Sequence, residues 1–107
     1  MSAMTPNSRP EIHHEAGAAR FVVRTPEGLA LCSYRREPGV AGEVLVLHHT
    51  EVPVALEGRG LAAALVAAAL AWARQEGLRV RPVCSYVAAY MRRHPETLDL
   101  LADGAAR

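Results

Sequence analysis

The stretch LEGRGLAAALVAAALAWARQEG, residues 56–77, places two glycines around Arg59 directly before a long run of alanine and leucine. Its spacing predicts an α-helix from Leu61 to Glu76, with Gly77 as a left-handed C-terminal cap. A helix normally begins at Ser, Thr, Asp or Asn, whose side chain accepts a free backbone N–H. Glycine stands in that place here. The N–H groups at the positive end of the helix dipole therefore stay available to an anion, most often a phosphate.

The composition is that of one ordinary globular domain. The chain has 107 residues, of which 50% are hydrophobic and 21% charged, and its net charge is +1. A chain of this length builds a single core, and its balanced charge creates no global field for nucleic acid or a membrane surface. The longest apolar run, residues 61–73, is shorter than the roughly 20 residues that cross a bilayer. We expect neither nucleic acid nor a membrane as a partner.

The N-terminal segment and the cysteines indicate a cytoplasmic protein. Residues 1–10 are polar and lack the apolar segment of a signal peptide. Cys32 and Cys84 match no zinc spacing and make no disulfide framework, which favours a reducing compartment. We expect residues 1–14 to form a flexible N-terminal tail and residues 15–107 to form a single domain.

The other segments predict strands on both sides of the main helix. The strands are expected at residues 21–24, 29–35, 43–48 and 78–83. The first two form a hairpin around the Thr-Pro-Glu-Gly turn at residues 25–28. Because a strand, a helix and a strand in succession form a parallel crossover, the last two strands are parallel neighbours. A short second helix is expected at residues 87–93, stopped before Pro95. The fold class is mixed α+β.

A Gly-x-Gly segment before a helix is ambiguous when taken alone, because many such loops only turn the chain tightly. Two familiar phosphate loops are excluded. The segment has no GxxxxGK[ST] pattern, so it is not a P-loop. It also lacks the third glycine and the distal acidic residue of a Rossmann fingerprint.

The surrounding residues are more specific. Residues 52–62, Val-Pro-Val-Ala-Leu-Glu-Gly-Arg-Gly-Leu-Ala, resemble motif A of the GCN5-related N-acetyltransferases (GNAT), which reads (Gln/Arg)-x-x-Gly-x-(Gly/Ala) between a strand and a long helix. Gly60 and Ala62 fill the last two positions, whereas Glu57 departs from the Gln or Arg of the motif. Three more segments resemble a compact single-domain GNAT-like subfamily: residues 49–53, 84–90 and 94–96.

The resemblance implies a GNAT-type α+β fold, whose mostly antiparallel sheet has one parallel strand pair splayed around acetyl-CoA. The pantetheine arm would pair with the strand end near Val52, and the pyrophosphate would sit on the loop at residues 58–63. Arg59 would add a cation or remain a solvated surface charge, and Arg92 would reach the cofactor phosphates. The implied cofactor-binding residues are Val52, Gly58, Arg59, Gly60, Leu61, Ala62, Ala63 and Arg92.

Cys84 is the first candidate catalytic residue. The resemblance places it at the end of the fourth strand, beside the thioester, either as a nucleophile or as a wall of the acetyl pocket. A helix that begins near Val87 would lower the pKa of its thiol. The alternative is a buried structural cysteine, which is the role we expect for Cys32.

Three further residues are candidates for proton transfer. Tyr90 stands four residues before His94, like the tyrosine of the Tyr-x-x-x-Gly-Phe segment that protonates the leaving thiolate in many GNAT enzymes; simple packing is the alternative. An attacking amine must also lose a proton. Glu51 or His49, which share one strand face, would accept it, unless they are merely surface or core residues. The adjacent histidines at 13–14 and 48–49 point to opposite faces, so no metal site is predicted.

These residues together predict an acetyl-CoA-dependent N-acetyltransferase that acts on an amine of a small molecule or a peptide. Two other functions stay open. One is a CoA- or acyl-CoA-binding module with little catalysis, and the other is a thiol hydrolase centred on Cys84 with His49 or His94 as its base. The sequence selects neither the amine nor an oligomeric state.

Overall fold

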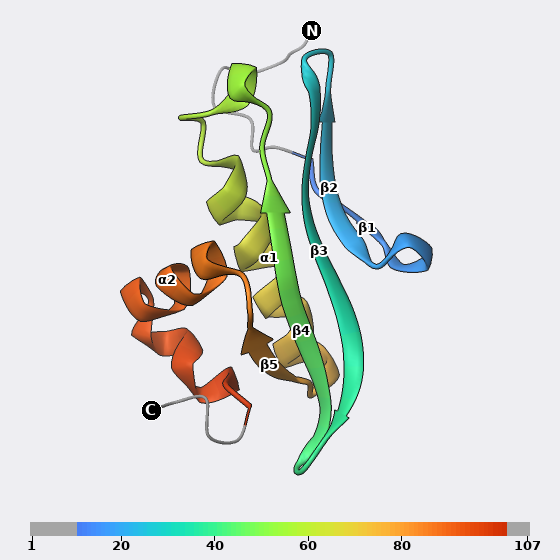
Figure 1. The fold of residues 1–107 in the computed structure, drawn as a ribbon, viewed down its shortest axis with the longest axis vertical. Coiled ribbons are helices and arrows are strands. Elements are labelled where there is room, and N and C mark those ends of the chain that lie inside the picture. Colours follow the sequence, from blue (N-terminus) through green and yellow to red (C-terminus); the bar gives the residue numbers. More distant parts are fainter. Residues whose placement is uncertain (1–10, 103–107) are drawn as a thin grey trace, which may run out of the picture.

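A five-stranded sheet in the order β1-β2-β3-β4-β5 forms the centre of the computed structural model, which describes residues 11–102 (Figure 1). The strands are β1 (His13–Glu15), β2 (Arg20–Thr25), β3 (Gly28–Gly39), β4 (Gly42–Glu51) and β5 (Arg79–Pro82). The helices are α1 (Leu61–Glu76) and α2 (Ser85–Arg93), and single 3-10 segments cover Ala16–Ala18, Val54–Leu56 and Pro95–Leu100. No helix among these described residues is long and apolar enough to cross a membrane.

The strand pairing confirms the predicted mixed α+β fold. β1 to β4 pair antiparallel, and β5 pairs in parallel with β4 from Val44 opposite Arg79 to Leu47 opposite Pro82. α1 connects the two parallel strands, as the strand-helix-strand pattern predicts. Its bounds, Leu61–Glu76, are those expected from the alanine-rich run, and Gly77 adopts the left-handed conformation of a C-terminal cap with φ 72°.

The sheet is larger than the sequence predicts, because two strands are longer and one edge strand is additional. β3 and β4 extend to Gly39 and Gly42, so only residues 40–41 form the turn between them. At the other edge, β1 begins at His13, inside the segment predicted as a tail. The His14 ring stacks on Phe21 with 4.1 Å between ring centroids, which anchors this short strand. Residues 1–10 of the predicted tail lie outside the described part of the chain.

The core lies between α1 and one face of the sheet. α1 buries Leu61, Leu65, Val66, Ala69, Leu70 and Ala73, and the sheet contributes Phe21, Cys32, Tyr34, Leu45 and Leu47 among others. The small alanines let the helix approach the sheet closely. A fully buried leucine such as Leu65 stabilises the fold by about 2 kcal/mol relative to an exposed one.

A β-bulge at His48 sets which residues of β4 face this core. The register shifts between Ser33 and Tyr34, whose partners are His49 and Leu47, so His48 is left without a partner across the strand pair. Cross-strand partners lie on the same face, and Tyr34 and Cys32 both belong to the core. Their partners Leu47 and Thr50 therefore face the same side of the sheet, although they are three residues apart.

Candidate active site

The candidate site lies where the two parallel strands separate. Their pairing ends at Leu47 and Pro82, where proline has no N–H to continue the ladder. One more backbone bond, 3.0 Å from the Cys84 nitrogen to the Leu47 oxygen, comes after this last pair. Beyond it β4 runs on to Glu51, whereas the chain after β5 turns away into α2 (Figure 1). The strands thus open a gap at the end of the sheet that faces the start of α1.

The glycine loop has the backbone geometry of an anion cradle. Gly58 and Gly60 have φ angles of 84° and 75°, in the left-handed region that L side chains rarely adopt. Gly60 is the N-cap of α1 and supplies no side-chain cap. The Gly60 oxygen accepts the N–H of Ala64, which leaves the N–H groups of the first three helical residues without an acceptor inside the helix.

A cavity of about 220 Å³ opens over these N–H groups. The lining residues are Val52, Leu56, Glu57, Gly58, Gly60, Leu61, Ala62, Ala63 and Tyr86. Six of the eight predicted cofactor-binding residues are among them; Arg59 and Arg92 are exposed and do not line the cavity. We call this space the loop cavity. Most of its lining residues are apolar or glycine, and its polar side chains are those of Glu57 and Tyr86, beside the uncapped helix end.

Cys84 lies between the ends of β4 and α2. It is the N-cap residue of α2, which begins at Ser85 rather than at the predicted Val87, and its thiol is half-buried. The Cys84 sulfur lies 3.4 Å from the Thr50 hydroxyl. Burial by itself would raise the pKa of this thiol. The nearby Thr50 hydroxyl, and after it the neighbouring backbone N–H groups of Val87, Tyr86 and Thr50, outweigh burial and hold the pKa of the thiol below its ordinary value.

His49 and Glu51 share a strand face, as predicted, and their side chains meet. Nε2 of His49 lies 3.1 Å from Oε1 of Glu51, and both side chains are exposed. Because neighbours along a strand point to opposite faces, this pair lies on the other side of β4 from Thr50. The structure therefore brings Cys84 and Thr50 together and places the two candidate bases across the strand from them.

The two tyrosines of α2 lie at different cavities. Tyr90 is buried, its ring stacks on His94 with 3.9 Å between centroids, and it lines a cavity of about 190 Å³ beside Ala67 and Leu70 of α1. Tyr86, one helical turn earlier, lines the loop cavity instead. Sequence reasoning missed Tyr86 because the predicted helix began one residue after it, although its spacing from Tyr90 places both on one helix face.

Comparison with known proteins identifies the family to which the chain is similar. A family model described as GCN5-related N-acetyl-transferase matches residues 20–100.

The chain belongs to the GCN5-related N-acetyltransferase (GNAT) family.

Curated relatives named Protein NATD1 agree with this. The one from Xenopus tropicalis is 30% identical over 99 residues, which cover 89% of this chain and 86% of the relative. The one from Homo sapiens is 39% identical over 88 residues, which cover 78% of this chain and 74% of the relative. The one from Gallus gallus is 32% identical over 89 residues, with 79% and 76% covered. The family supports a general acetyltransferase function.

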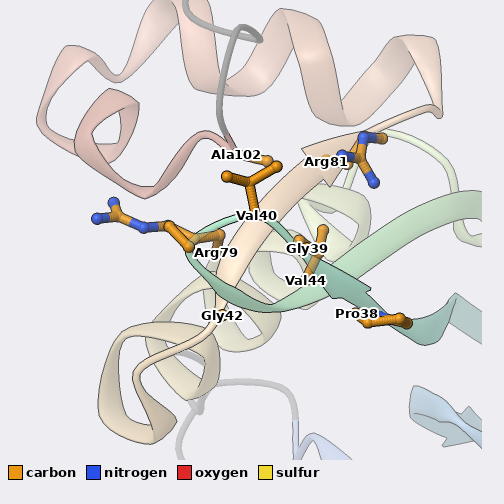
Figure 2. A pocket seen from close by; sticks show the side chains of 9 residues that line it. Pro38, Gly39, Val40, Gly42, Val44, Arg79, Arg81 and Ala102 are labelled. Atoms are coloured by element: carbon orange, nitrogen blue, oxygen red, sulfur yellow. The ribbon is translucent and has the colours of Figure 1, made fainter.

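A larger cavity at the opposite end of the sheet lacks the features of a GNAT site. It measures about 380 Å³ and lies between the β3–β4 turn and β5, lined by Pro38, Gly39, Val40, Ala41, Gly42, Val44, Arg79, Arg81 and Ala102. Arg79 and Arg81 project away from each other in Figure 2. Arg79 donates to the Asp99 backbone oxygen at 2.8 Å, and Arg81 pairs with Glu37 at 3.5 Å. Its two cations do not converge on a ligand position.

Metal ligands are not clustered in the part of the chain that the structure describes. Residues 11–102 contain no group of three or more His, Cys, Asp or Glu side chains arranged to hold an ion. His13 and His14 are separated by strand alternation: His14 packs on Phe21, while His13 pairs with Glu11 at 3.5 Å.

Proposed function

We propose that this chain is an acetyl-CoA-dependent N-acetyltransferase that acts on an amine of a small molecule or a peptide. The observation that supports this most is the uncapped start of α1, which opens into the loop cavity beside the gap between β4 and β5. Three free N–H groups at the positive end of a 16-residue helix suit the two negative phosphates of CoA. A neutral acceptor would gain only the hydrogen bonds, whereas an anion also gains from the helix dipole.

The remaining predicted residues fit a cofactor that enters through this cavity. Val52 lies at the end of β4, where its strand edge is available to the amide groups of a pantetheine arm. Arg59 and Arg92 are exposed on the loop and on α2, and we assign them to the outer phosphates. Acetyl-CoA held there would supply a thioester whose carbonyl carbon is the electrophile for an unprotonated amine.

The residues around the gap would carry out two proton transfers, one from the incoming amine and one to the departing CoA sulfur. We assign the His49–Glu51 pair to accept the proton of the incoming amine through a water molecule, because the two side chains are exposed and joined at 3.1 Å. A tyrosine hydroxyl of α2 would donate a proton to the departing CoA sulfur. Tyr90 is the residue that the resemblance implies, and Tyr86 is the one that lines the loop cavity.

The thiol hydrolase is the less well supported alternative. Such an enzyme needs a histidine beside its cysteine to accept the thiol proton. Among the described residues, the side-chain hydrogen bond of Cys84 goes to Thr50, while His49 pairs with Glu51 and His94 bonds to the Tyr90 backbone oxygen at 2.8 Å. A CoA-binding module without catalysis differs from the enzyme only in turnover.

A cytoplasmic location is part of the proposal, because free thiols persist in a reducing compartment.

A charge placed in the loop cavity tests CoA binding. Ala62→Glu puts a carboxylate beside the expected phosphates and should weaken CoA binding at least about tenfold by like-charge repulsion. The variant should stay folded, because an acidic residue in the first helical turn favours the helix. Ala62→Gln, of equal size and no charge, is the matched control. Isothermal titration with CoA that shows equal affinities for both variants would remove the phosphate from this loop.

Mass spectrometry tests the reaction and the role of Cys84. Incubation with acetyl-CoA and a panel of amines should yield an acetylated amine, and incubation without an amine should leave the protein unlabelled. We expect direct transfer, with Cys84 lining the acetyl pocket, so Cys84→Ala should keep much of the activity. An acetyl group on Cys84 that passes to an amine at the turnover rate would instead establish a covalent mechanism. CoA binding without acetylation of any amine would favour the binding module.

A further inference from the structure

The turn between β2 and β3 touches the segment that leads from β4 to the glycine loop. β3 and β4 pair as far as Leu31 and Glu51, and the turn lies at the same end of the sheet as the chain that follows β4 (Figure 1). A Cβ atom built on Gly28 would lie 3.0 Å from Cγ of the Pro53 ring and 3.5 Å from its Cβ. Because carbon atoms in contact normally lie about 3.5–4.0 Å apart, glycine is what leaves room for the proline ring here.

The β2–β3 turn is closed by hydrogen bonds of its own. The Thr25 hydroxyl donates to the Gly28 oxygen at 3.1 Å and accepts the N–H of Glu27 at 3.1 Å. Thr25 and Gly28 are also the last residue pair of the β2–β3 ladder. Gly28 has a φ of 143°, which L side chains rarely adopt. The turn is therefore a fixed support against which Pro53 packs.

Pro53 connects that contact to the glycine loop through a short 3-10 segment. The Pro53 oxygen accepts the N–H of Leu56 at 2.8 Å. The Val54 oxygen accepts the N–H of Glu57 at 3.1 Å. These two bonds place the fully buried Leu56, and Glu57 beside it, in the wall of the loop cavity. Gly58 follows directly, so the position of Pro53 sets where the loop begins.

The loop itself is held from its two ends. Among the described residues, no backbone hydrogen bond ties residues 58–59 to another segment. On one side α1 holds the loop through the Gly60 oxygen, which accepts the N–H of Ala64 at 3.0 Å. On the other side stands the 3-10 segment Val54–Leu56. A displacement of that segment therefore moves the loop.

We propose that Gly28 and Pro53 are positioning residues of the loop cavity: the close approach of the β2–β3 turn to the Pro53 ring fixes the segment from Pro53 to Glu57, and this segment holds the glycine loop in place for its anion. The inference deepens the proposed function and rests on it only for CoA as the anion. A side chain at residue 28 would displace Pro53 and, with it, the loop. The β2–β3 turn, which does not line the cavity, thus acts on cofactor affinity.

Gly28→Ala tests this contact, with Gly42→Ala as the matched control. Gly42 also begins a strand after a turn and has a positive φ of 126°, but a Cβ there would meet no atom within 4 Å. Both variants should lower the urea midpoint. Only Gly28→Ala should weaken CoA binding in calorimetry, by roughly tenfold, because its loop N–H groups must be reordered before they meet the phosphates.

Hydrogen exchange on the full chain without CoA gives a readout that does not depend on the cofactor. The amides of Leu56 and Glu57 form the two bonds of the 3-10 segment. Their exchange should be about tenfold faster in Gly28→Ala than in Gly42→Ala, because local opening of this segment becomes easier.

A second substitution should rescue the first. Pro53→Ala removes the Cγ atom that would lie 3.0 Å from the added Cβ and keeps the Cβ at 3.5 Å. The double variant Gly28→Ala/Pro53→Ala should therefore bind CoA within about twofold of Pro53→Ala alone. A general loss of stability caused by Gly28→Ala would not be relieved in this way.

A third pair of variants loosens the support without a new atom at Gly28, and it keeps the test open if Gly28→Ala does not fold. Thr25→Val keeps the shape and removes the hydroxyl that closes the turn, so exchange at Leu56 and Glu57 should become faster. Thr25→Ser keeps the hydroxyl and should leave the exchange rates at those of the wild type.

The outcomes separate this proposal from the acetyltransferase assignment. Equal CoA affinities in Gly28→Ala and Gly42→Ala would overturn it, and so would additive losses in the double variant or equal exchange rates in Thr25→Val and Thr25→Ser. A wild-type protein that binds no CoA would contradict the proposed function. In that case faster exchange of Leu56 and Glu57 in Gly28→Ala would still support positioning of the loop by the turn, and unchanged exchange would overturn it.

Discussion

The two ends of α1 are built on the same residue in nearly the same backbone conformation, with φ and ψ of 75° and 17° at Gly60 and of 72° and 25° at Gly77. At the C-terminal end the chain satisfies its own groups: the Gly77 nitrogen donates to the Arg74 oxygen at 3.3 Å, and the Leu78 nitrogen donates to the Ala73 oxygen at 2.8 Å. At the N-terminal end the first N–H groups point into the loop cavity. A left-handed glycine closes one end of the helix and opens the other.

The neighbours of each glycine explain the difference between the two ends. After Gly77 comes Leu78, which is buried and pulls the chain back onto the core. Before Gly60 stand Gly58 and Arg59, both exposed, and neither brings an acceptor to the helix start. An unsatisfied helix end therefore indicates ligand binding better than a left-handed glycine does, because a left-handed glycine stands at both ends of α1.

A methyl group placed at each glycine should test the comparison of the two helix ends directly. Gly60→Ala and Gly77→Ala should each destabilise the fold by about 1–2 kcal/mol, because both residues are left-handed. A Cβ at Gly60 would meet no protein atom within 4 Å, so it would occupy the open space that a phosphate needs. CoA affinity should fall roughly tenfold for Gly60→Ala and stay unchanged for Gly77→Ala.

Urea unfolding and calorimetric CoA titration on the two variants check this pair. Because Ala at either position has the same unfavourable left-handed backbone, Gly77→Ala controls for the loss of stability in Gly60→Ala. Equal CoA affinities for the two variants would show that both glycines only terminate a helix.

A larger effect, on turnover, should separate the two tyrosines of α2. Tyr86 lines the loop cavity and Tyr90 packs against Ala67 and Leu70. Loss of a positioned proton donor lowers turnover by roughly a hundredfold, so we expect Tyr86→Phe to lower kcat far more than Tyr90→Phe. Steady-state kinetics with the best amine from the screen measures both. If Tyr90→Phe shows the larger loss, the tyrosine implied by the GNAT resemblance is the donor and the cavity lining is misleading.

The smallest effect concerns stability near the closed end of α1. The His14 ring packs edge-on against Trp72 with 4.5 Å between centroids. Burial is the main cause that lowers the pKa of His14 below 6.5, and the positive charge of Arg36 lowers it further. The unfolded chain therefore binds a proton more readily than the folded chain, and stability should decline as the pH falls through 6.5 and level off below the folded pKa.

Replacement of His14 isolates that contribution. In His14→Phe, the urea midpoint should depend less on pH than in the wild type, and CoA affinity should stay the same because His14 lies far from the helix start in the packing around Trp72. An equal pH dependence of the urea midpoint in both proteins would assign the acid sensitivity to other groups.

The main elements of the fold were predictable because local signals agreed with tertiary packing. Alanine and leucine between Gly60 and Gly77 set the bounds of α1, and strand, helix and strand in succession implied the parallel pair. The prediction was poorest where tertiary contacts decide the structure. His14 of β1 packs on Phe21 of the neighbouring strand and on Trp72, which is distant in sequence. A polar His-His segment carries no local sign of these contacts.

The candidate site shows the same contrast between features that local sequence predicts and features that tertiary contacts decide. Backbone features depend on residue type, and the free helix end was expected at residues 58–63 because glycine supplies no side-chain cap; the left-handed conformations of Gly58 and Gly60 were not predicted. Contacts between side chains of different strands depend on register. Strand alternation alone puts Thr50 on the face opposite Glu51. It does not predict that Thr50 lies beside Cys32 and Cys84, because the bulge at His48 determines that pairing.

The bulge at His48 determines which face each later residue of β4 occupies. Leu47 and Thr50 share a face although they are three residues apart, because His48 has no partner on β3. Deletion of His48 would leave Leu47 and Thr50 two residues apart, the spacing at which a regular strand places both on one face. Pairing of His48 with Ser33 would instead shift the register by one residue, carry Thr50 to the opposite face and turn His49 toward Cys84. A slip of the register, rather than a change in chain length, would therefore exchange a hydroxyl for an imidazole at the gap.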